Sequence, residues 1–354
     1  MNPIRVLVID DSAFMRKVIK DMLVSDQRIE VIATARNGED GLKKIKRLSP
    51  DVVTMDIHMP VMDGITALQS IMQDCPVPVV MLSSETAEGA EKTLQAISHG
   101  AVDFITKPSN YLSMENGEKT EEIINKVIVA SAVTMSPSPK ESSGNSADLP
   151  VTTERQLFDK TIVTIGTSTG GPRALQKLIP TLPGDFSAPI LIVQHMPPGF
   201  TKSLADRLNS MSNITVKEAV HGEILHDGTA YIAPGDYHMR VNKVGTALAI
   251  ELTEEAPVNG HRPSVDVLFA SAGPLEKINK IAVILTGMGS DGSNGLKQMK
   301  ASDPSTIAIA ESEKTAVIYG MPKAAVKTER VNHIVPLNQV ADTLEKLLKD
   351  TGRM

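Results

Sequence analysis

The first 130 residues repeat one alternation of apolar and amphipathic segments. Short apolar runs typical of buried strands lie at residues 4–9, 30–35, 51–56, 77–83 and 101–106. Segments with helical spacing of their apolar residues lie between the runs. Strands that alternate with helices pair in parallel, so this pattern predicts a doubly wound α/β sheet of the flavodoxin-like type. The functional residues of such a sheet gather at the carboxyl ends of its strands.

The alternation stops near residue 130 and resumes near residue 159. The chain between them is rich in Ser, Pro, Thr and Gly, which predicts a flexible linker over 131–158. Further buried-strand patterns follow at 161–166, 189–195, 281–287 and 305–310. Segment 229–252 alternates in polarity and is punctuated by glycine, which predicts an inserted β-hairpin. We therefore predict two α/β domains with doubly wound parallel sheets, over 1–130 and 159–350, the second of them Rossmann-like.

Composition narrows the class of protein. The 354 residues are 41% hydrophobic and carry a net charge of −6, which describes a globular protein and argues against nucleic-acid binding. No apolar run approaches the roughly 20 residues that span a bilayer, and the N-terminal segment lacks the order of a signal peptide. We expect a cytoplasmic monomer without membrane insertion. Cys75 is the only cysteine, which excludes an intrachain disulfide, and we expect it to be a buried apolar residue.

Carboxylates follow two predicted strands of the first domain. Asp10 and Asp11 come directly after one strand, and Asp56 ends another. Because the ends of parallel strands can be neighbours, these carboxylates would share one crevice, which suits Mg²⁺ with its preference for oxygen ligands. Lys107 and Ser83 also lie at strand ends and can bring an ammonium and a hydroxyl to the same edge. Any one of these aspartates could instead only cap the helix that follows it.

The motifs LVIDDS, DVVTMDIHMPVMDG, MLSS and DFITKP resemble those of the response-regulator receiver domain. The resemblance implies that Asp56 is the phosphoacceptor, and that Mg²⁺ is held by Asp10, Asp11, Asp56 and the backbone carbonyl of His58. It also implies three residues that support the phosphoryl site: Lys107, Ser83 and Phe104. An aspartyl phosphate adds charge and strong acceptor oxygens, which can shift a surface between two states.

The stretch GTSTGG at residues 166–171 lies between an apolar run and a helix-like segment. It matches G-x-S-x-G, in which Ser168 would be a nucleophile on a tight strand-to-helix turn. The same loop could instead cradle a phosphate, because glycines allow close backbone approach and a helix N-terminus attracts anions. A serine nucleophile also needs a base and a group that orients the base. His195 and Asp291 both come where an apolar run gives way to a turn, so we expect Ser168, His195 and Asp291 to form a triad at one sheet edge.

Other residues compete for these roles. His261 is the second candidate for the base, and Arg262 beside it could bind a substrate carboxylate. Asp266 lies within a helix pattern, where we expect a solvated face rather than the orienting acid. The segment GMGSDG at 287–292 matches the dinucleotide-binding fingerprint, but no ribose-binding acid follows at the expected spacing. A nucleotide-dependent oxidoreductase is therefore a weaker hypothesis than a serine hydrolase.

The motifs IGTSTGGP, IVQHMPPGFTKSLADRL, YIAPGDYHM, GHRPSVDVLF and LTGMGSDG together resemble the catalytic domain of the chemotaxis protein-glutamate methylesterases, the CheB family. The resemblance implies that Ser168 is the nucleophile, His195 the general base and Asp291 the orienting acid. It also implies that Thr169 and Met288 line the active site, and we expect their backbone N–H groups to form the oxyanion hole.

This second resemblance also implies a function. The expected activity is a phosphorylation-activated serine hydrolase that releases methanol from glutamate methyl esters of methyl-accepting chemotaxis receptors and deamidates receptor glutamines. The expected phosphodonor is a chemotaxis histidine kinase, with Mg²⁺ serving the receiver and no cofactor serving the esterase chemistry. We expect the unphosphorylated receiver to obstruct the esterase site. A catalytically silent module that only docks to a receptor or adaptor is the alternative.

Overall fold

The computed structural model describes residues 2–107, 117–133, 147–148, 158 and 160–350. The chain divides into two compact units, Met1–Ser142 and Ser143–Met354, here called the N-terminal and C-terminal units. Most of the predicted linker, at 134–146 and 149–157, lies outside the described residues, so our boundaries at 130 and 158 stay a prediction. Among the helices that the structure describes, none is long and apolar enough to cross a bilayer.

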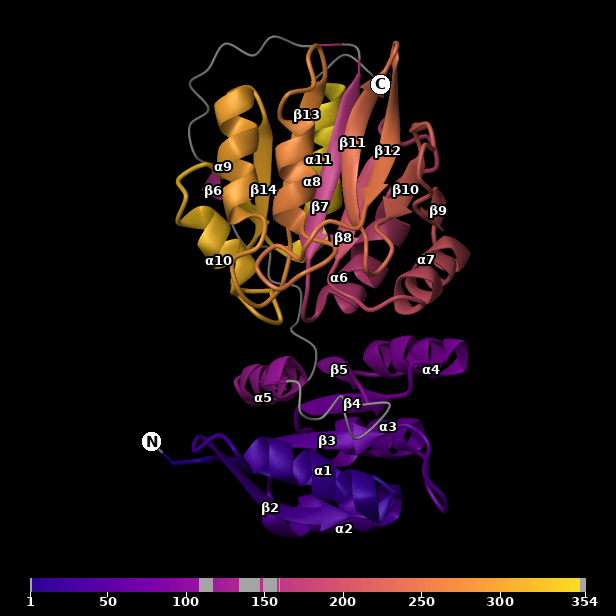
Figure 1. The fold of residues 1–354 in the computed structure, drawn as a ribbon, viewed down its shortest axis with the longest axis vertical. Helices are drawn as coiled ribbons and strands as arrows, with labels where there is room; N and C mark the ends of the chain where they lie inside the picture. Colours follow the sequence, from indigo (N-terminus) through magenta and orange to yellow (C-terminus); the bar gives the residue numbers. More distant parts are fainter. Residues whose placement is uncertain (1, 108–116, 134–146, 149–157, 159, 351–354) are drawn as a thin grey trace. The chain divides into compact units, whose positions relative to one another are not determined.

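A five-stranded parallel sheet with the order β2-β1-β3-β4-β5 forms the centre of the N-terminal unit (Figure 1). Its strands are β1 (Ile4–Ile9), β2 (Ile29–Ala35), β3 (Val52–Asp56), β4 (Val79–Ser83) and β5 (Asp103–Thr106). Its helices are α1 (Ala13–Val24), α2 (Gly38–Leu48), α3 (Gly64–Asp74), α4 (Ala87–Ser98) and α5 (Gly117–Ser131). The strand order reverses between β1 and β3, and open α/β sheets place their binding sites at the carboxyl ends of the strands at such a point.

Side-chain caps explain where four of these helices begin. In each, a polar side chain just before the helix accepts a hydrogen bond from the backbone N–H three residues further on. The capping residues are Ser12, Asn37, Asp63 and Thr86. These caps fix the start of the helix after each strand, and with it the loop at the carboxyl edge of the sheet.

An eight-stranded sheet with the order β6-β15-β14-β13-β7-β8-β10-β9 forms the C-terminal unit. Every pairing in it is parallel except that of β6 with β15. In sheet order the strands are β6 (Ala147–Asp148), β15 (His333–Val335), β14 (Ile307–Glu311), β13 (Asn279–Ile284), β7 (Thr161–Thr167), β8 (Ile190–Gln194), β10 (Thr229–Ile232) and β9 (Thr215–Glu218). The two parallel sheets confirm the predicted fold class.

Helices cover both faces of this sheet, and Figure 1 shows α8 and α11 on opposite sides of it. The helices are α6 (Gly171–Leu178), α7 (Phe200–Met211), α8 (Val265–Ala272), α9 (Ser293–Ser302), α10 (Met321–Val326) and α11 (Val340–Lys349), with short 3₁₀ turns at Ile179–Thr181 and Leu337–Gln339. On one face, Leu268 and Phe269 of α8 join a buried cluster with Ile162 of β7 and Ala282 of β13. This packing holds α8 firmly against the strands that carry the candidate site.

The predicted hairpin is present but shorter than expected. Strands β11 (His238–Val244) and β12 (Ala247–Thr253) pair antiparallel in a separate two-stranded sheet. The start of segment 229–252 instead forms β10, which pairs in parallel with β8 and β9. Its residues Ala230, Tyr231 and Ile232 are all buried, as expected for a strand inside a sheet covered on both faces.

Candidate active site

Ser168 lies on a tight turn between strand β7 and helix α6. Its N–H donates to the Thr286 carbonyl at 3.1 Å, and its carbonyl accepts from the Gly171 N–H at 2.7 Å. Gly170 has a φ of 78°, in the left-handed region that favours glycine. A Cβ on Gly171 would lie only 2.0 Å from the side-chain oxygen of Gln194, so this position also requires glycine. The glycines of the motif thus serve a turn that leaves Ser168 half-buried.

The side chains of His195 and Asp291 are joined by a hydrogen bond, with Nε2 and Oδ2 2.8 Å apart. His195 follows β8, Asp291 lies in the loop after β13, and β7 lies between these two strands. The backbone N–H of His195 donates to the Thr167 carbonyl at 3.3 Å, directly beside Ser168. Nδ1 of His195 is buried and has no hydrogen-bond partner among the described residues. The structure therefore brings the three predicted residues to one sheet edge and leaves one imidazole nitrogen available.

Asp291 is held as a carboxylate by its surroundings. Besides His195, it accepts from the Ser264 hydroxyl and from the N–H groups of Val265, Asp266 and Gly292, at 2.7–3.0 Å. Burial alone would raise the pKa of Asp291, but the bonds from His195 and these amides outweigh it and lower the pKa to about 2. Ser264 precedes α8 yet makes no side-chain bond to its own helix, so Asp291 caps the first turn of α8 in its place. A permanent negative charge therefore faces the imidazole.

Thr169 and Met288 lie in the two loops that meet at Ser168. Thr169 is buried, and its carbonyl accepts from the Thr286 hydroxyl at 2.9 Å. A Cβ on Gly287, the residue before Met288, would lie 2.9 Å from the Cβ of Ser168. The loop that carries Met288 thus passes directly against the candidate nucleophile. The oxyanion role of both residues stays a prediction.

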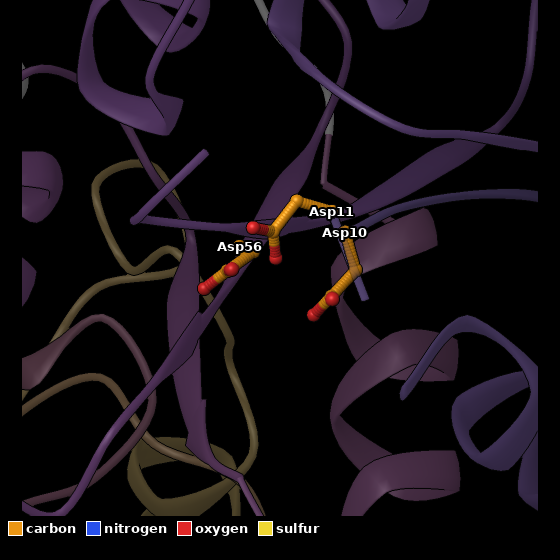
Figure 2. A group of neighbouring side chains, drawn as sticks. All are labelled: Asp10, Asp11 and Asp56. Carbon is orange, nitrogen blue, oxygen red and sulfur yellow. The ribbon is translucent and has the colours of Figure 1, made fainter. Parts of the chain in front are cut away.

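The N-terminal unit gathers a second set of predicted residues. Asp10, Asp11 and Asp56 each offer a carboxylate oxygen within 4.8 Å of the others, at the carboxyl ends of β1 and β3 (Figure 2). Lys107 Nζ lies 2.8 Å from Oδ2 of Asp10 and 2.8 Å from Oδ2 of Asp56. Three neighbouring carboxylates form an all-oxygen donor set that fits Mg²⁺.

Burial and pairing shift the pKa values of this cluster. Burial raises the pKa of Asp56, against the opposing effect of the Lys107 ammonium. Burial alone would lower the pKa of Lys107, but its bonds to Asp10 and Asp56 outweigh burial and raise it. The lysine therefore stays charged beside Asp56, where it can contact an added phosphoryl group.

The remaining predicted receiver residues lie nearby. The buried hydroxyl of Ser83 donates to the Gly89 carbonyl at 3.1 Å and accepts from the Thr93 hydroxyl at 2.7 Å. Phe104 is buried, and Lys126 Nζ lies 5.1 Å from the centre of its ring. The exposed imidazole of His58 lies 3.5 Å from Lys92 Nζ on α4. The His58 imidazole thus lies beside the Lys92 side chain, and the role of the His58 backbone carbonyl stays a prediction.

Comparison with known proteins agrees with this layout. The sequence model of the CheB methylesterase family matches residues 163–344, and that of the response regulator receiver domain matches residues 6–116. The protein-glutamate methylesterase/protein-glutamine glutaminase of Oceanobacillus iheyensis is 56% identical over 351 residues, covering 98% of this chain and 100% of that protein. This chain belongs to the CheB methylesterase family.

Two further CheB relatives support the assignment. The protein-glutamate methylesterase/protein-glutamine glutaminase of Halalkalibacterium halodurans is 54% identical over 346 residues, covering 98% of this chain and 99% of that protein. The crystal structure of the Thermotoga maritima CheB methylesterase catalytic domain is 44% identical with a TM-score of 0.52, and the match covers 53% of this chain and 99% of that one. Both resemblances drawn from the sequence motifs are confirmed.

Sequence reasoning missed several residues that build the CheB site. The Gln194 amide donates to the carbonyls of Ser168 and His195 at 3.1 and 3.2 Å, and so links the two loops. Glu311, fully buried at the end of β14, accepts from the Thr286 N–H at 2.8 Å, and Thr286 in turn accepts from Ser168. Burial raises the pKa of Glu311 to about 7. The available signal was the place of Gln194 and Glu311 at strand ends, where polar residues gather around a site.

Two minor expectations were wrong. Asp266 does not lie on a solvated face: it is buried, and its carboxylate accepts from the Gly295 N–H at 2.6 Å. The reason is that α8 is covered both by the sheet and by α9, so its polar first turn faces another element rather than water. Cys75 is only partly buried, because it lies at the C-terminal end of α3.

Proposed function

We propose that this protein is a phosphorylation-activated methylesterase that hydrolyses glutamate methyl esters on methyl-accepting chemotaxis receptors and deamidates receptor glutamines. The observation that carries the proposal is the His195–Asp291 hydrogen bond at the sheet edge where Ser168 begins its turn. The names of its relatives, protein-glutamate methylesterase/protein-glutamine glutaminase, support the substrate class. The receiver match over 6–116 supports control by phosphorylation.

The first half of the reaction acylates the enzyme. The Ser168 hydroxyl attacks the γ-carbonyl carbon of the ester while Nδ1 of His195 takes its proton, and Asp291 stabilises the imidazolium through Nε2. The tetrahedral oxyanion accepts hydrogen bonds from backbone N–H groups, for which Thr169 and Met288 are our candidates. The intermediate then expels the methoxy group, which receives the proton from His195 and leaves as methanol.

The second half restores the enzyme. A water molecule attacks the acyl carbon and gives its proton to His195, and Ser168 leaves with that proton, which releases a free glutamate side chain. A glutamine side chain follows the same route with ammonia as the leaving group. One catalytic apparatus therefore serves both reactions.

Phosphorylation at Asp56 is the proposed control. A chemotaxis histidine kinase is the proposed donor, and Asp10, Asp11, Asp56 and the His58 carbonyl would hold Mg²⁺, which neutralises phosphoryl oxygens when bound. Lys107 adds an ammonium 2.8 Å from the Asp56 carboxylate, where it can pair with the phosphoryl group. The added charge then shifts the receiver between two states.

The test is methanol release from a methylated receptor fragment. We expect wild type to release methanol, more so with Mg²⁺ and a small-molecule phosphodonor, and Ser168→Ala to lose nearly all turnover. Asp56→Ala should keep its basal rate and lose the response to the phosphodonor. No release from folded wild type on a fragment verified as methylated would favour the docking module instead. Activation of Asp56→Ala by the phosphodonor would remove Asp56 as the switch.

A further inference from the structure

A second histidine lies flat against the candidate general base. The rings of His195 and His261 are stacked, with their centroids 3.8 Å apart and their planes 13° from parallel. Among the described residues the imidazole of His195 makes one hydrogen bond, at Nε2, and the side chain is only 8% exposed. One hydrogen bond at a ring edge fixes the position of that edge but leaves the ring able to tilt about it. A stacked neighbour restricts the tilt.

A rigid turn carries His261. Val258 and His261 exchange two backbone hydrogen bonds at 3.0 and 2.9 Å, and Asn259 and Gly260 between them have φ values of 53° and 78°. Two consecutive residues in the left-handed region, with Asn first and Gly second, are typical of a tight type I′ turn. The loop is therefore a short, well-defined support rather than a long arm.

Hydrogen bonds connect the same turn to Asp291, the acid that orients His195. The Asn259 amide donates to Asp266 Oδ2 at 3.2 Å, and the Asp266 N–H donates to Asp291 Oδ1 at 3.0 Å. Asp291 then bonds to His195. His195 is thus held from its edge by Asp291 and on its face by His261, and both supports connect through Asp266.

We infer that His261 is a positioning residue for the general base: its ring fixes the plane of the His195 imidazole so that Nδ1 meets the Ser168 proton at a productive angle. This inference rests on the proposed function. Proton transfer depends steeply on alignment, so a small tilt of the base lowers the rate of the chemical step. The face of an aromatic ring also accommodates the imidazolium that forms during transfer.

This role differs from the one that sequence reasoning held in reserve for His261, that of the base itself. Asp291 pairs with His195, which gives His195 the orienting acid that a general base needs. The inference assigns the contribution of His261 to the aromatic ring that stacks on His195. Phenylalanine should supply that ring.

The experiment compares His261→Ala and His261→Phe with wild type in the full chain. We expect His261→Ala to lower kcat on the order of tenfold with KM within about twofold, and His261→Phe to recover most of the loss. His226→Ala, which removes an exposed histidine of the same unit, is the matched control and should behave as wild type. Circular dichroism melts check that each variant is folded.

A fluorophosphonate that reacts with activated serines provides a readout that needs no receptor substrate. Its rate of attachment to Ser168, followed by mass spectrometry, should fall in His261→Ala and recover in His261→Phe. Labelling of wild type without methanol release would count against the proposed substrate and leave this comparison in place. The inference is overturned if His261→Ala reacts as wild type does, if His261→Phe is as slow as His261→Ala, or if the loss lies only in KM.

Discussion

The Asp291→Asn substitution separates the charge of the candidate triad acid from its shape. Oδ2 accepts from the Val265 N–H and faces His195 Nε2, and Oδ1 accepts from a hydroxyl and two further N–H groups. Asparagine replaces one of these oxygens by an NH₂ group that can only donate. In either orientation this group faces at least one buried backbone N–H, so a hydrogen bond is lost.

Both the stability and the activity should fall, by amounts that follow from these contacts. The lowering of the Asp291 pKa from 3.8 to about 2 corresponds to about 2 kcal/mol of stability at neutral pH. An unsatisfied buried N–H costs about 1–3 kcal/mol, which partly overlaps with that figure. We therefore expect a loss of about 2–4 kcal/mol, or roughly 5–10 °C in Tm. The activity should fall by roughly 10³–10⁴, because an asparagine NH₂ directed at Nε2 stabilises the imidazole tautomer that carries its proton on Nδ1.

Calorimetry and methanol release on the full chain test this reasoning. A carboxyl with a lowered pKa stabilises the fold above about pH 4, and this stability is lost as the pH falls toward 2. The Tm difference between wild type and Asp291→Asn should therefore be larger at pH 7 than at pH 3. Asp342→Asn, the same change at an exposed position in the first turn of α11, should leave the activity unchanged and lower the Tm much less, because it removes only a favourable charge at a helix N-terminus. More than a tenth of the wild-type rate in Asp291→Asn, or a Tm difference independent of pH, would refute the argument.

Two further predictions concern the supports of the Ser168 loop. Gly171→Ala places a Cβ where the Gln194 side-chain oxygen lies, so we expect Gln194 to be displaced from the Ser168 carbonyl. Methanol release should then fall at least about tenfold. An unchanged rate would show that the Gln194–Ser168 hydrogen bond does not support the nucleophile. Burial raises the pKa of Glu311 to about 7, so between about pH 4.5 and 7 the unfolded chain ionises first and wild type loses stability as the pH rises. Glu311→Gln removes this titration, so the Tm of the variant minus the Tm of wild type, measured by calorimetry, should be larger at pH 8 than at pH 5. The same Tm difference at both pH values would contradict the raised pKa of Glu311.

Strand ends were the part of the site that sequence could predict. Because parallel strands share one carboxyl edge, the positions of Asp56, Ser168 and His195 after apolar runs were enough to bring them to the edges where the structure has them. The start of β10 was misassigned because its short buried run reads equally well as part of a hairpin.

The residues that hold the candidate triad in place through tertiary packing could not be predicted from the sequence. Asp266 is buried only because α9 packs on α8, a tertiary contact that helical spacing does not report. His261 meets His195 only through the geometry of a tight turn 66 residues further along the chain. Gln194 has an ordinary strand-end position, and its bonds to two loops depend on the absence of a Cβ at Gly171.

The cap that Asp291 places on α8 makes the candidate triad observable without any reaction. The N–H groups of Val265 and Asp266 are bonded to the same carboxylate that holds His195, so they exchange with solvent deuterium only when Asp291 moves away or the helix turn opens. The exchange rate of these two amides therefore reports how often the acid leaves its place. Hydrogen–deuterium exchange at Val265 and Asp266 therefore measures the integrity of the candidate triad in the absence of any substrate.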